Sequence, residues 1–328
     1  MSVLSAAIER LAAIPNLTVL RDCPLSAYTR FAIGGPAAVL CDTSHADTFV
    51  RALHIAKQMA LPRMVIGGGT NLVVSDAGYD GIVLRFTGAQ IERNGLTLIV
   101  DAGAILQDVV DYSTALGLKG LETLTGIPGY LGGALYGNAG AYGHSMQEIV
   151  RRVRFTDGLK VKDFENAACE FHYRESIFKD EKNWIILSAE LQLREGNPSE
   201  LQKIATEIRT IRDAKYPPSM KCAGSIFKNL FYGELPASVQ AQIPAPVVRE
   251  GKVPSAWFLE QVGAKGMQRG DIKVATYHAN LIYNDGAGTA ADLVVIIEEL
   301  KKRVRERFGF ELEEEVQFVG FEYSVETA

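Results

Sequence analysis

Two glycine-rich segments constrain this 328-residue chain more than any other feature. The first follows a short apolar run at 64–66 and consists of Gly67, Gly68, Gly69, Thr70, Asn71 and Leu72. The second extends from 126 to 143 and includes Gly126, Ile127, Pro128, Gly129, Gly132, Gly133, Asn138, Ala139 and Gly140. Because glycine permits positive φ and lets a ligand approach bare N–H groups, the pair indicates a cleft for the diphosphate of a dinucleotide.

The first segment departs from the familiar phosphate-binding motifs. Leu72 occupies the third glycine position of G-x-G-x-x-G, and the lysine of a P-loop is absent. Taken alone, this segment is also typical of a tight connection between strands. The second segment suits neither a regular helix nor a regular strand, so the two together favour a ligand site.

The composition narrows the class of partner. Nearly half of the residues are apolar, which is enough for two or three domains with substantial cores. A net charge of −5 provides no basic surface for nucleic acid, so we expect a small-molecule ligand and no nucleic-acid partner. No apolar run approaches the length that spans a membrane, and the N-terminus lacks the features of a leader peptide.

Cysteine and histidine spacing excludes two further classes. The four cysteines are scattered without a C-x-x-C pair, which predicts neither a disulfide framework nor a zinc site. The five histidines show no metal-ligand spacing, so no metal is expected. We expect a cytoplasmic monomer.

Hydrophobic periodicity predicts a mixed α+β chain. From 37 to 86 the pattern predicts strand, helix, strand, turn and strand, a β-α-β unit with Ser44 as the helix N-cap. Further strands are expected at 96–100, 148–155, 184–193 and 225–228, and helices at 104–116, 200–215, 254–262 and 289–308. The proline pair after Tyr216 is the expected domain boundary.

Three polar positions are unremarkable by themselves. Arg174 reads as a strand-end arginine paired with a carboxylate, and Ser225 reads as a turn serine, because G-x-S-x-G is absent. The acids at 311–315 resemble a solvated strand edge, with Glu315 on the polar side of an alternating pattern.

Set side by side, seven blocks of the chain resemble the UDP-N-acetylenolpyruvoylglucosamine reductase (MurB) family. The blocks are 29–37, 67–76, 126–143, 173–178, 224–229, 257–266 and 312–320. No tyrosine-bearing loop lies between Arg174 and Lys215, so the chain resembles the second subtype of the family.

The resemblance implies an FAD-binding fold of the vanillyl-alcohol-oxidase type with two α+β subdomains, followed by an α+β substrate domain. We place the first subdomain at 1–86, the second at 87–215 and the substrate domain at 216–328, with the final segment returning toward the flavin. The implied activity is that of an FAD-dependent oxidoreductase, in which NADPH reduces the enolpyruvyl group of UDP-N-acetylglucosamine enolpyruvate for peptidoglycan synthesis. FAD is expected, because the reaction needs a hydride that no side chain can donate, and we expect it to be held non-covalently.

The resemblance also assigns roles to individual residues. Arg174 and Glu315 match the pair that stabilises the developing negative charge, and Ser225 matches the proton donor. Substrate-binding positions match Tyr173, Arg212, Lys215, Asn229 and His278. The glycine-rich segments match the FAD-binding loops.

Two other functions remain open at the level of sequence. An FAD oxidase can use the same fold, because fold does not determine function. The third hypothesis is a flavin-binding protein that has lost catalysis. The presence of Arg174, Ser225 and Glu315 at positions that match the family's catalytic residues argues against it.

Overall fold

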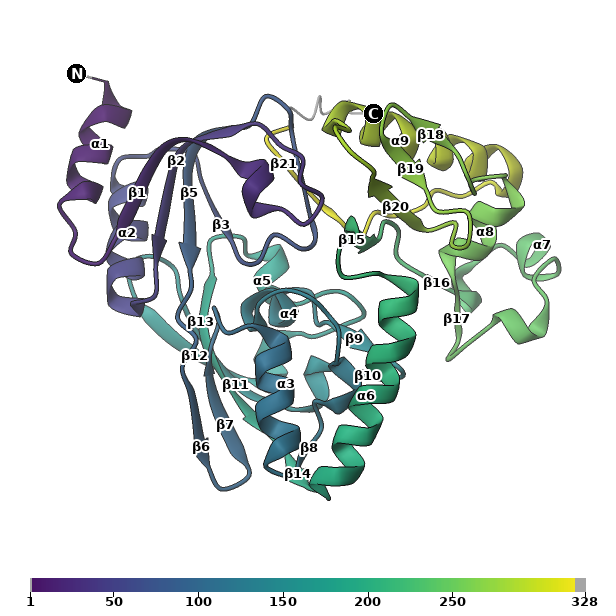
Figure 1. Cartoon of the computed structure of the whole chain (residues 1–328), viewed down its shortest axis with the longest axis horizontal. Helices are drawn as coiled ribbons and strands as arrows, with labels where there is room; N and C mark the ends of the chain where they lie inside the picture. Colours follow the sequence, from purple (N-terminus) through teal and green to yellow (C-terminus); the bar gives the residue numbers. More distant parts are fainter. Residues whose placement is uncertain (1, 322–328) are drawn as a thin grey trace. The chain divides into compact units, whose positions relative to one another are not determined.

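The computed structural model describes residues 2–321, which divide into two units. The first unit contains the chain up to Cys23 together with 37–69 and 80–218 (Figure 1). The second contains 24–36, 70–79 and the described chain from Ser219 onward. Two stretches within the first 86 residues therefore belong to the second unit.

The N-terminal part of the first unit is a four-stranded sheet with the order β1-β2-β5-β3. Its strands are β1 (Thr18–Pro24), β2 (Pro36–Thr43), β3 (Arg63–Ile66) and β5 (Tyr79–Phe86), and its helices are α1 (Val3–Ala12) and α2 (Ala46–Gln58). Strands β3 and β5 are parallel, so Ile66 lies beside Arg85. The first glycine segment starts directly after β3, at the carboxyl end of that strand.

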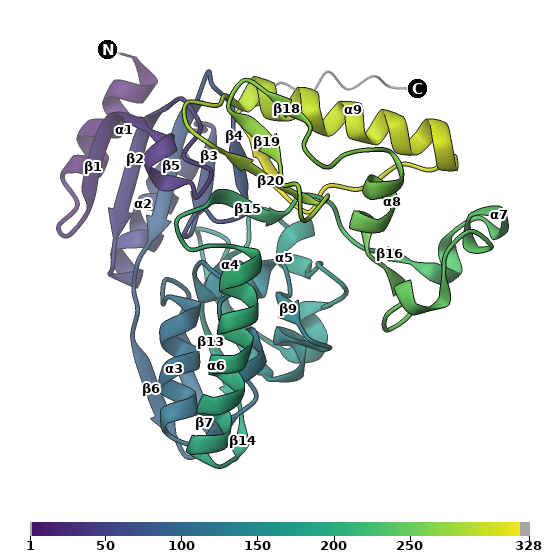
Figure 2. The same cartoon turned by 45° about the vertical axis from the view of Figure 1, so that its right-hand side comes forward.

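A second sheet forms the rest of the first unit, with the order β12-β11-β13-β7-β6. Its antiparallel strands are β6 (Ile91–Asn94), β7 (Thr97–Asp101), β11 (Val150–Thr156), β12 (Val161–Glu165) and β13 (Ile185–Gln192). The helices are α3 (Leu106–Ala115), α4 (Leu131–Tyr136), α5 (Ile177–Asp180) and α6 (Pro198–Lys215), and α3 lies alongside α6 (Figure 2). Two short strand pairs, β8 (Leu118–Lys119) with β14 (Arg194–Glu195) and β9 (Gly140–Ala141) with β10 (His144–Ser145), complete it.

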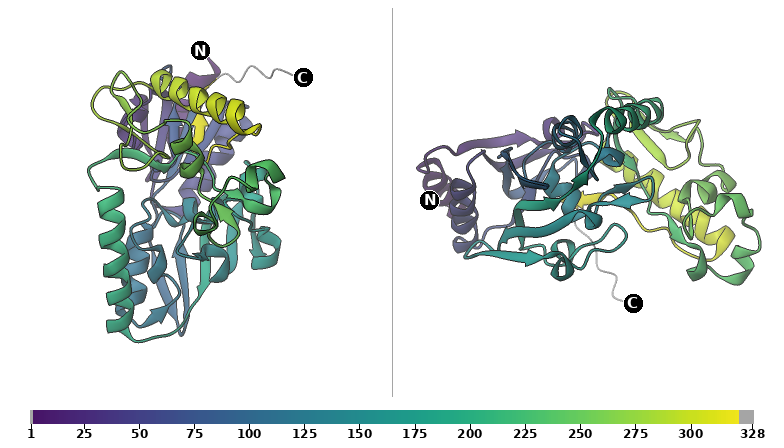
Figure 3. Two further views of the ribbon diagram at one scale, coloured as in Figure 1. Left: turned by 90° about the vertical axis from the view of Figure 1, so that its right-hand side faces the viewer. Right: turned by 90° about the horizontal axis from the view of Figure 1, so that it is seen from below.

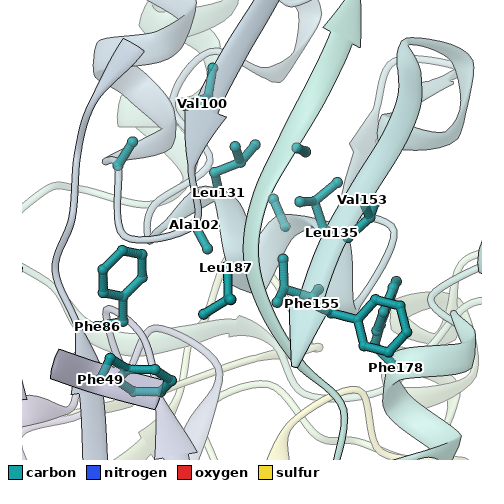
Figure 4. Packing of buried hydrophobic residues seen from close by; sticks show 14 of the residues in the cluster. Phe49, Phe86, Val100, Ala102, Leu131, Leu135, Val153, Phe155, Phe178 and Leu187 are labelled. Carbon is teal, nitrogen blue, oxygen red and sulfur yellow. The ribbon is translucent and has the colours of Figure 1, made fainter. Parts of the chain in front are cut away.

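One hydrophobic core joins both sheets of the first unit. Phe49 of α2 packs against Phe86 of β5 with ring centroids 5.6 Å apart, and Phe155 of β11 packs edge-on against Phe178 of α5 (Figure 4). All four rings are buried. Aromatic burial of this kind is a large favourable term in folding, so the two sheets form one continuous scaffold for the glycine segments.

The second unit is built on a four-stranded sheet with the order β15-β20-β19-β18. The strands are β15 (Lys221–Ser225), β18 (Gln268–Arg269), β19 (Ile272–Val274) and β20 (Leu281–Asn284). Smaller pairs are β4 (Leu72–Val74) with β21 (Gln317–Val319) and β16 (Leu230–Phe231) with β17 (Lys252–Val253), and the helices are α7 (Ala237–Gln240), α8 (Ser255–Gln261) and α9 (Ala290–Phe308).

Helix α9 is the long yellow-green helix of Figure 3, and it is capped at both ends. The Thr289 hydroxyl accepts a hydrogen bond from the Asp292 amide, and the Asp76 carboxylate accepts from the amides of Ala290 and Ala291 at 2.9 Å. Gly309 ends the helix with φ 77°. The 70–79 stretch is thereby joined to the C-terminal part of the same unit.

Two local predictions were wrong. The N-cap of α2 is His45 and not Ser44, and the Thr43 hydroxyl accepts the His45 amide just before the helix. The strand expected at 225–228 is β15 (Lys221–Ser225), which ends at Ser225 after a register shift against β20 between Cys222 and Ser225. Beyond it, the Ile226 carbonyl accepts from the Glu315 amide and the Lys228 amide donates to the Glu313 carbonyl.

No helix within residues 2–321 is both long enough and apolar enough to cross a membrane.

Candidate functional site

The two glycine segments of the first unit approach one another closely. A Cβ added to Gly68 would come within 3.1 Å of the Gly129 Cα, so the backbones touch where a side chain would separate them. Gly69, Gly126 and Gly129 have φ values of 62°, 75° and 110°, which only glycine adopts readily. The sequence therefore needs glycine here for both conformation and proximity.

The glycines that begin helix α4 serve different purposes. A Cβ on Gly132 would lie 3.0 Å from the Ala102 Cβ, so this glycine lets the helix pack against the end of the second sheet. A Cβ on Gly133 would meet no atom of the described chain within 4 Å. Gly133 therefore presents a smooth, open backbone that a ligand can approach.

These features fit FAD. The two segments contain no lysine or arginine, which suits a diphosphate that is bound by main-chain N–H groups. Thr70, Asn71 and Leu72 belong to the second unit, where Leu72 begins β4 and pairs with Gln317.

Arg174 occupies a strained turn of the first unit. His172 and Glu175 exchange two backbone hydrogen bonds, which leaves Tyr173 and Arg174 as the two turn residues. Arg174 has φ 62°, in the left-handed region that costs an L-residue about 1–2 kcal/mol. Strain at a residue with a reactive side chain motivates a functional hypothesis.

Polar contacts from neighbouring segments hold this turn. Asn138 donates its amide to the His172 carbonyl at 2.8 Å and accepts from the Gln147 amide at 3.0 Å. The Ser176 hydroxyl donates to the Tyr136 carbonyl at 2.8 Å, and the Lys179 ammonium donates to the Arg174 carbonyl at 3.1 Å. The second glycine segment thus supports Arg174 directly.

The guanidinium of Arg174 has two further contacts in this unit. It donates to the Gly140 carbonyl at 3.3 Å and lies 5.2 Å from the centroid of the Tyr173 ring. Both contacts are made by residues that the sequence assigned to binding.

Arg212 and Lys215 lie at the end of helix α6 and flank one aromatic ring. The Arg212 guanidinium is 5.7 Å and the Lys215 ammonium 5.0 Å from the centroid of Tyr216. A Cβ on Gly126 would come within 3.0 Å of Arg212 Cδ, so this glycine leaves room for the arginine. Tyr216 was missed by the sequence reasoning, which used it only as a boundary marker.

Ser225 lies at the end of β15 in the second unit, immediately after Gly224. Gly224 has φ 77°, and a Cβ there would meet no described atom within 4 Å. Ile226 and Phe227 then enter the core, with exposures of 0% and 1%. The serine hydroxyl is thereby fixed at the edge of a rigid hydrophobic core.

Glu315 is joined to Ser225 through the backbone of the same unit. Its amide donates to the Ile226 carbonyl at 2.7 Å, and its carbonyl accepts from the Asn71 side chain at 2.9 Å. Asn71, Glu315 and Ile226, the residue after Ser225, are therefore linked by hydrogen bonds within the second unit.

The neighbouring glutamates have lysine partners. Glu313 pairs with the buried Lys228, and Glu314 accepts from Lys301 at 2.9 Å. Lysine partners orient both of these carboxylates.

Asn280 is a second residue that sequence reasoning missed. Its side chain is 2% exposed, accepts from the Phe227 amide at 2.9 Å, and donates to the Phe227 carbonyl at 2.9 Å. It also donates to the Ser255 hydroxyl at 2.7 Å. Two predicted binding residues are connected with Asn280. His278 precedes it by two positions, and the Asn229 side chain accepts a hydrogen bond from the amide of Ser255, to whose hydroxyl Asn280 donates.

The predicted site residues are divided between the two units. Arg174, Tyr173, Arg212 and Lys215 belong to the first unit with the glycine segments 67–69 and 126–140, whereas Ser225, Asn229, His278 and Glu315 belong to the second. Among residues 2–321, no three His, Cys, Asp or Glu side chains are grouped so as to hold a metal ion.

Known proteins match both parts of the chain. Residues 36–159 match an FAD-binding domain, and residues 216–319 match the C-terminal domain of UDP-N-acetylenolpyruvoylglucosamine reductase. These matches confirm FAD as the cofactor and the expected α+β FAD-binding fold.

Full-length relatives agree with these domain matches. A UDP-N-acetylenolpyruvoylglucosamine reductase of Solibacter usitatus is 58% identical over 95% of this chain and 100% of its own length. Another from Rubrobacter xylanophilus is 36% identical over 91% of this chain and 94% of its own. The crystal structure of UDP-N-acetylenolpyruvylglucosamine reductase (MurB) from Thermus caldophilus superposes with a TM-score of 0.71 and 28% identity, covering 92% of this chain and 98% of that one. The chain therefore belongs to the UDP-N-acetylenolpyruvoylglucosamine reductase family.

Proposed function

We propose that Arg174, Ser225 and Glu315 carry the chemistry of this enzyme. The protein is an FAD-dependent oxidoreductase that uses NADPH to reduce UDP-N-acetylglucosamine enolpyruvate to UDP-N-acetylmuramate, a step of peptidoglycan precursor synthesis. FAD, when bound, takes a hydride from NADPH and supplies it to the substrate. The chain must do the rest: bind, stabilise charge and deliver a proton.

Arg174 stabilises the negative charge that develops beside the substrate carboxylate when the terminal carbon receives hydride. A guanidinium presents a fork of donors that matches carboxylate and enolate oxygens. The strained backbone of Arg174, at φ 62°, is the single observation that most supports this role, because the surrounding hydrogen bonds maintain a conformation that folding alone disfavours.

Ser225 donates the proton to the other carbon of the former double bond. A hydroxyl is a weak acid, so it serves only when it is held in position and the resulting alkoxide is relieved by a nearby donor. The core-anchored Ile226 and Phe227, together with Asn280, supply the positioning.

Glu315 acts on the same developing charge as Arg174. It does so either as a protonated acid or through a hydrogen-bonded partner, since a bare carboxylate would repel the negative charge. Arg212, Lys215, Tyr173, Asn229 and His278 bind the sugar nucleotide. The glycine segments, with Thr70, Asn71 and Leu72, bind FAD.

We further propose that 1–86 and 87–215 are FAD-binding subdomains and that 216–328 is the substrate domain. Residues 322–328 of that segment lie outside the described chain. Because NADPH and UDP-sugars are cytoplasmic metabolites, we place the enzyme in the cytoplasm, and we propose that it acts as a monomer.

An anaerobic absorbance experiment tests these roles. NADPH should bleach the bound flavin, and the enolpyruvyl sugar nucleotide should restore its colour. In Glu315→Gln, bleaching should be normal while recovery slows on the order of a hundredfold. The matched control is Glu311→Gln, whose carboxylate pairs with Lys301 and Arg305 and which should recover normally. Recovery of Glu315→Gln at the control rate would remove Glu315 from the mechanism.

A further inference from the structure

The ring of Tyr130 lies against the first glycine segment, although Tyr130 belongs to the second. A Cβ on Gly67 would lie 3.5 Å from Tyr130 Cδ2, and a Cβ on Gly68 would lie 3.6 Å from Tyr130 Cδ1. The two edges of one ring therefore face two consecutive glycines. At these distances the ring is in van der Waals contact range of both positions.

The hydroxyl of Tyr130 is linked to the first sheet. Arg85 donates to it at 2.5 Å, and the same guanidinium donates to Asp42 at 2.8 Å. Thr87 donates to the other Asp42 oxygen at 3.2 Å, which fixes the carboxylate. Asp42 is on β2, and Arg85 is on the adjacent strand β5. Arg85 pairs across the sheet with Ile66, the residue that precedes Gly67.

The backbone of Tyr130 is linked to the second sheet. Tyr130 forms a backbone bridge with Ile105. The amide of the next residue, Leu131, donates to the Ala104 carbonyl at 2.8 Å, and the Gly132 amide donates to the Ala102 carbonyl at 2.8 Å. Tyr130 thus contacts the connection that follows β7 of the second sheet through its main chain, and the first sheet through its hydroxyl.

We propose that Tyr130 is a positioning residue that, through Arg85 and Asp42, holds the two glycine segments at the separation the FAD diphosphate requires. This inference rests on the proposed assignment of those segments to FAD. The hydroxyl accepts from Arg85, so its own proton remains available for donation. The Arg85–Asp42 ion pair fixes the guanidinium that binds Tyr130. The hydrogen bond from Arg85 to the Tyr130 hydroxyl involves a charged donor, and such bonds are stronger than those between neutral groups.

Tyr130→Phe tests the inference, because it removes the hydroxyl and keeps the ring that faces Gly67 and Gly68. We expect the dissociation constants of FAD and of ADP, a flavin-free diphosphate ligand, to rise together on the order of tenfold in the apoprotein. Binding is measured by flavin fluorescence and by ADP competition at a temperature where circular dichroism shows every variant to be folded. Tyr112→Phe, which alters an exposed tyrosine of α3, is the matched control and should bind as wild type.

Asp42→Asn provides a second route to the same conclusion. It should weaken binding of both ligands, and the double variant with Tyr130→Phe should lose less than the sum of the single losses, because both act through Arg85. Unchanged FAD binding in Tyr130→Phe, or a loss for FAD with ADP unaffected, would overturn the inference.

Gly68→Ala separates this inference from the proposed function. Its Cβ would crowd Gly129, so FAD binding should weaken if the segments bind FAD. If Gly68→Ala loses FAD while Tyr130→Phe does not, only the role of Tyr130 fails. If Gly68→Ala binds FAD normally, the assignment of the glycine segments fails as well.

Discussion

The Arg174 turn and the Ser225 strand end both contain a residue in the left-handed backbone region, but they place it differently. In the first, the left-handed residue is Arg174 itself, at φ 62°. In the second it is Gly224, at φ 77°, the residue before the candidate proton donor. Glycine adopts this conformation without steric cost, whereas arginine does not.

The supports of the two regions differ in the same way. Side-chain hydrogen bonds from Asn138, Ser176 and Lys179 maintain the Arg174 turn. Ser225 continues directly into two core residues, and the buried Asn280 binds the backbone of one of them. One functional group is therefore held by a polar network at the expense of strain, and the other by a relaxed backbone anchored in the core.

The largest expected effect is that of Ser225→Ala. Loss of a positioned proton donor should slow flavin reoxidation by the enolpyruvyl substrate about 10²–10⁴-fold, while reduction by NADPH stays near the wild-type rate. Stopped-flow absorbance separates the two half-reactions. Ser238→Ala, on the exposed face of α7, is the control, and equal reoxidation rates in the two variants would show that Ser225 is not the donor.

Exchanging the left-handed residues tests the comparison itself. Arg174→Gly and Arg174→Ala should both slow reoxidation on the order of a hundredfold, but the glycine variant should be more stable than the alanine variant by about 1 kcal/mol. Gly224→Ala should lose about 1–2 kcal/mol, although its Cβ meets open space, because the cost is conformational. Chemical denaturation measures these differences. Equal stability of the two Arg174 variants would contradict strain at the turn.

The two supporting asparagines should separate stability from rate. Asn280→Ala leaves the buried Phe227 amide without its acceptor and removes one of the two donors to the Phe227 carbonyl, the other being the Ser255 hydroxyl, and should cost about 2–3 kcal/mol. Asn138→Ala should cost less, about 1–2 kcal/mol, yet slow reoxidation roughly tenfold by releasing the Arg174 turn. If Asn138→Ala destabilises as much as Asn280→Ala and leaves the rate unchanged, the polar network is structural only.

The smallest effect concerns Asp157, far along the chain from both regions. The Lys160 amide, then Lys162, then the Leu159 amide stabilise its carboxylate and hold its pKa well below the usual range. Because the pKa of Asp157 is lower in the folded than in the unfolded state, the ionised carboxylate raises the free energy of unfolding at pH values above its unfolded pKa near 3.9. This stabilisation is lost as the pH falls toward the folded pKa. Asp157→Ala should therefore lower the melting temperature at pH 7 and progressively less below about pH 4. A constant difference across pH 2–7 would contradict this linkage, and neither half-reaction should change.

Local sequence patterns were sufficient for much of the scaffold. The helix expected at 289–308 is α9 at Ala290–Phe308, with Leu293, Ile297, Leu300 and Val304 fully buried, because 3.6-residue periodicity reports a packed helix face directly. The strands expected at 96–100, 148–155 and 184–193 are β7, β11 and β13 within one or two residues. The strand expected at 225–228 was wrong: β15 ends at Ser225, and Phe227 instead forms an isolated bridge with Glu314, a long-range contact that local sequence does not report.

What the sequence alone determined was the family, the cofactor and the residues to suspect, since glycine clusters and block order are local properties. The tertiary structure decided what each residue does for its neighbours. Asn138, expected to bind FAD, uses both the oxygen and the nitrogen of its side-chain amide in hydrogen bonds to Gln147 and His172. Gly132, also expected to bind FAD, allows the close approach of Ala102. Tyr130 and Asn280 acquired roles only in three dimensions. Their partners Arg85 and Phe227 lie 45 and 53 positions away, and hydrogen bonds depend on distances in space that sequence spacing does not encode.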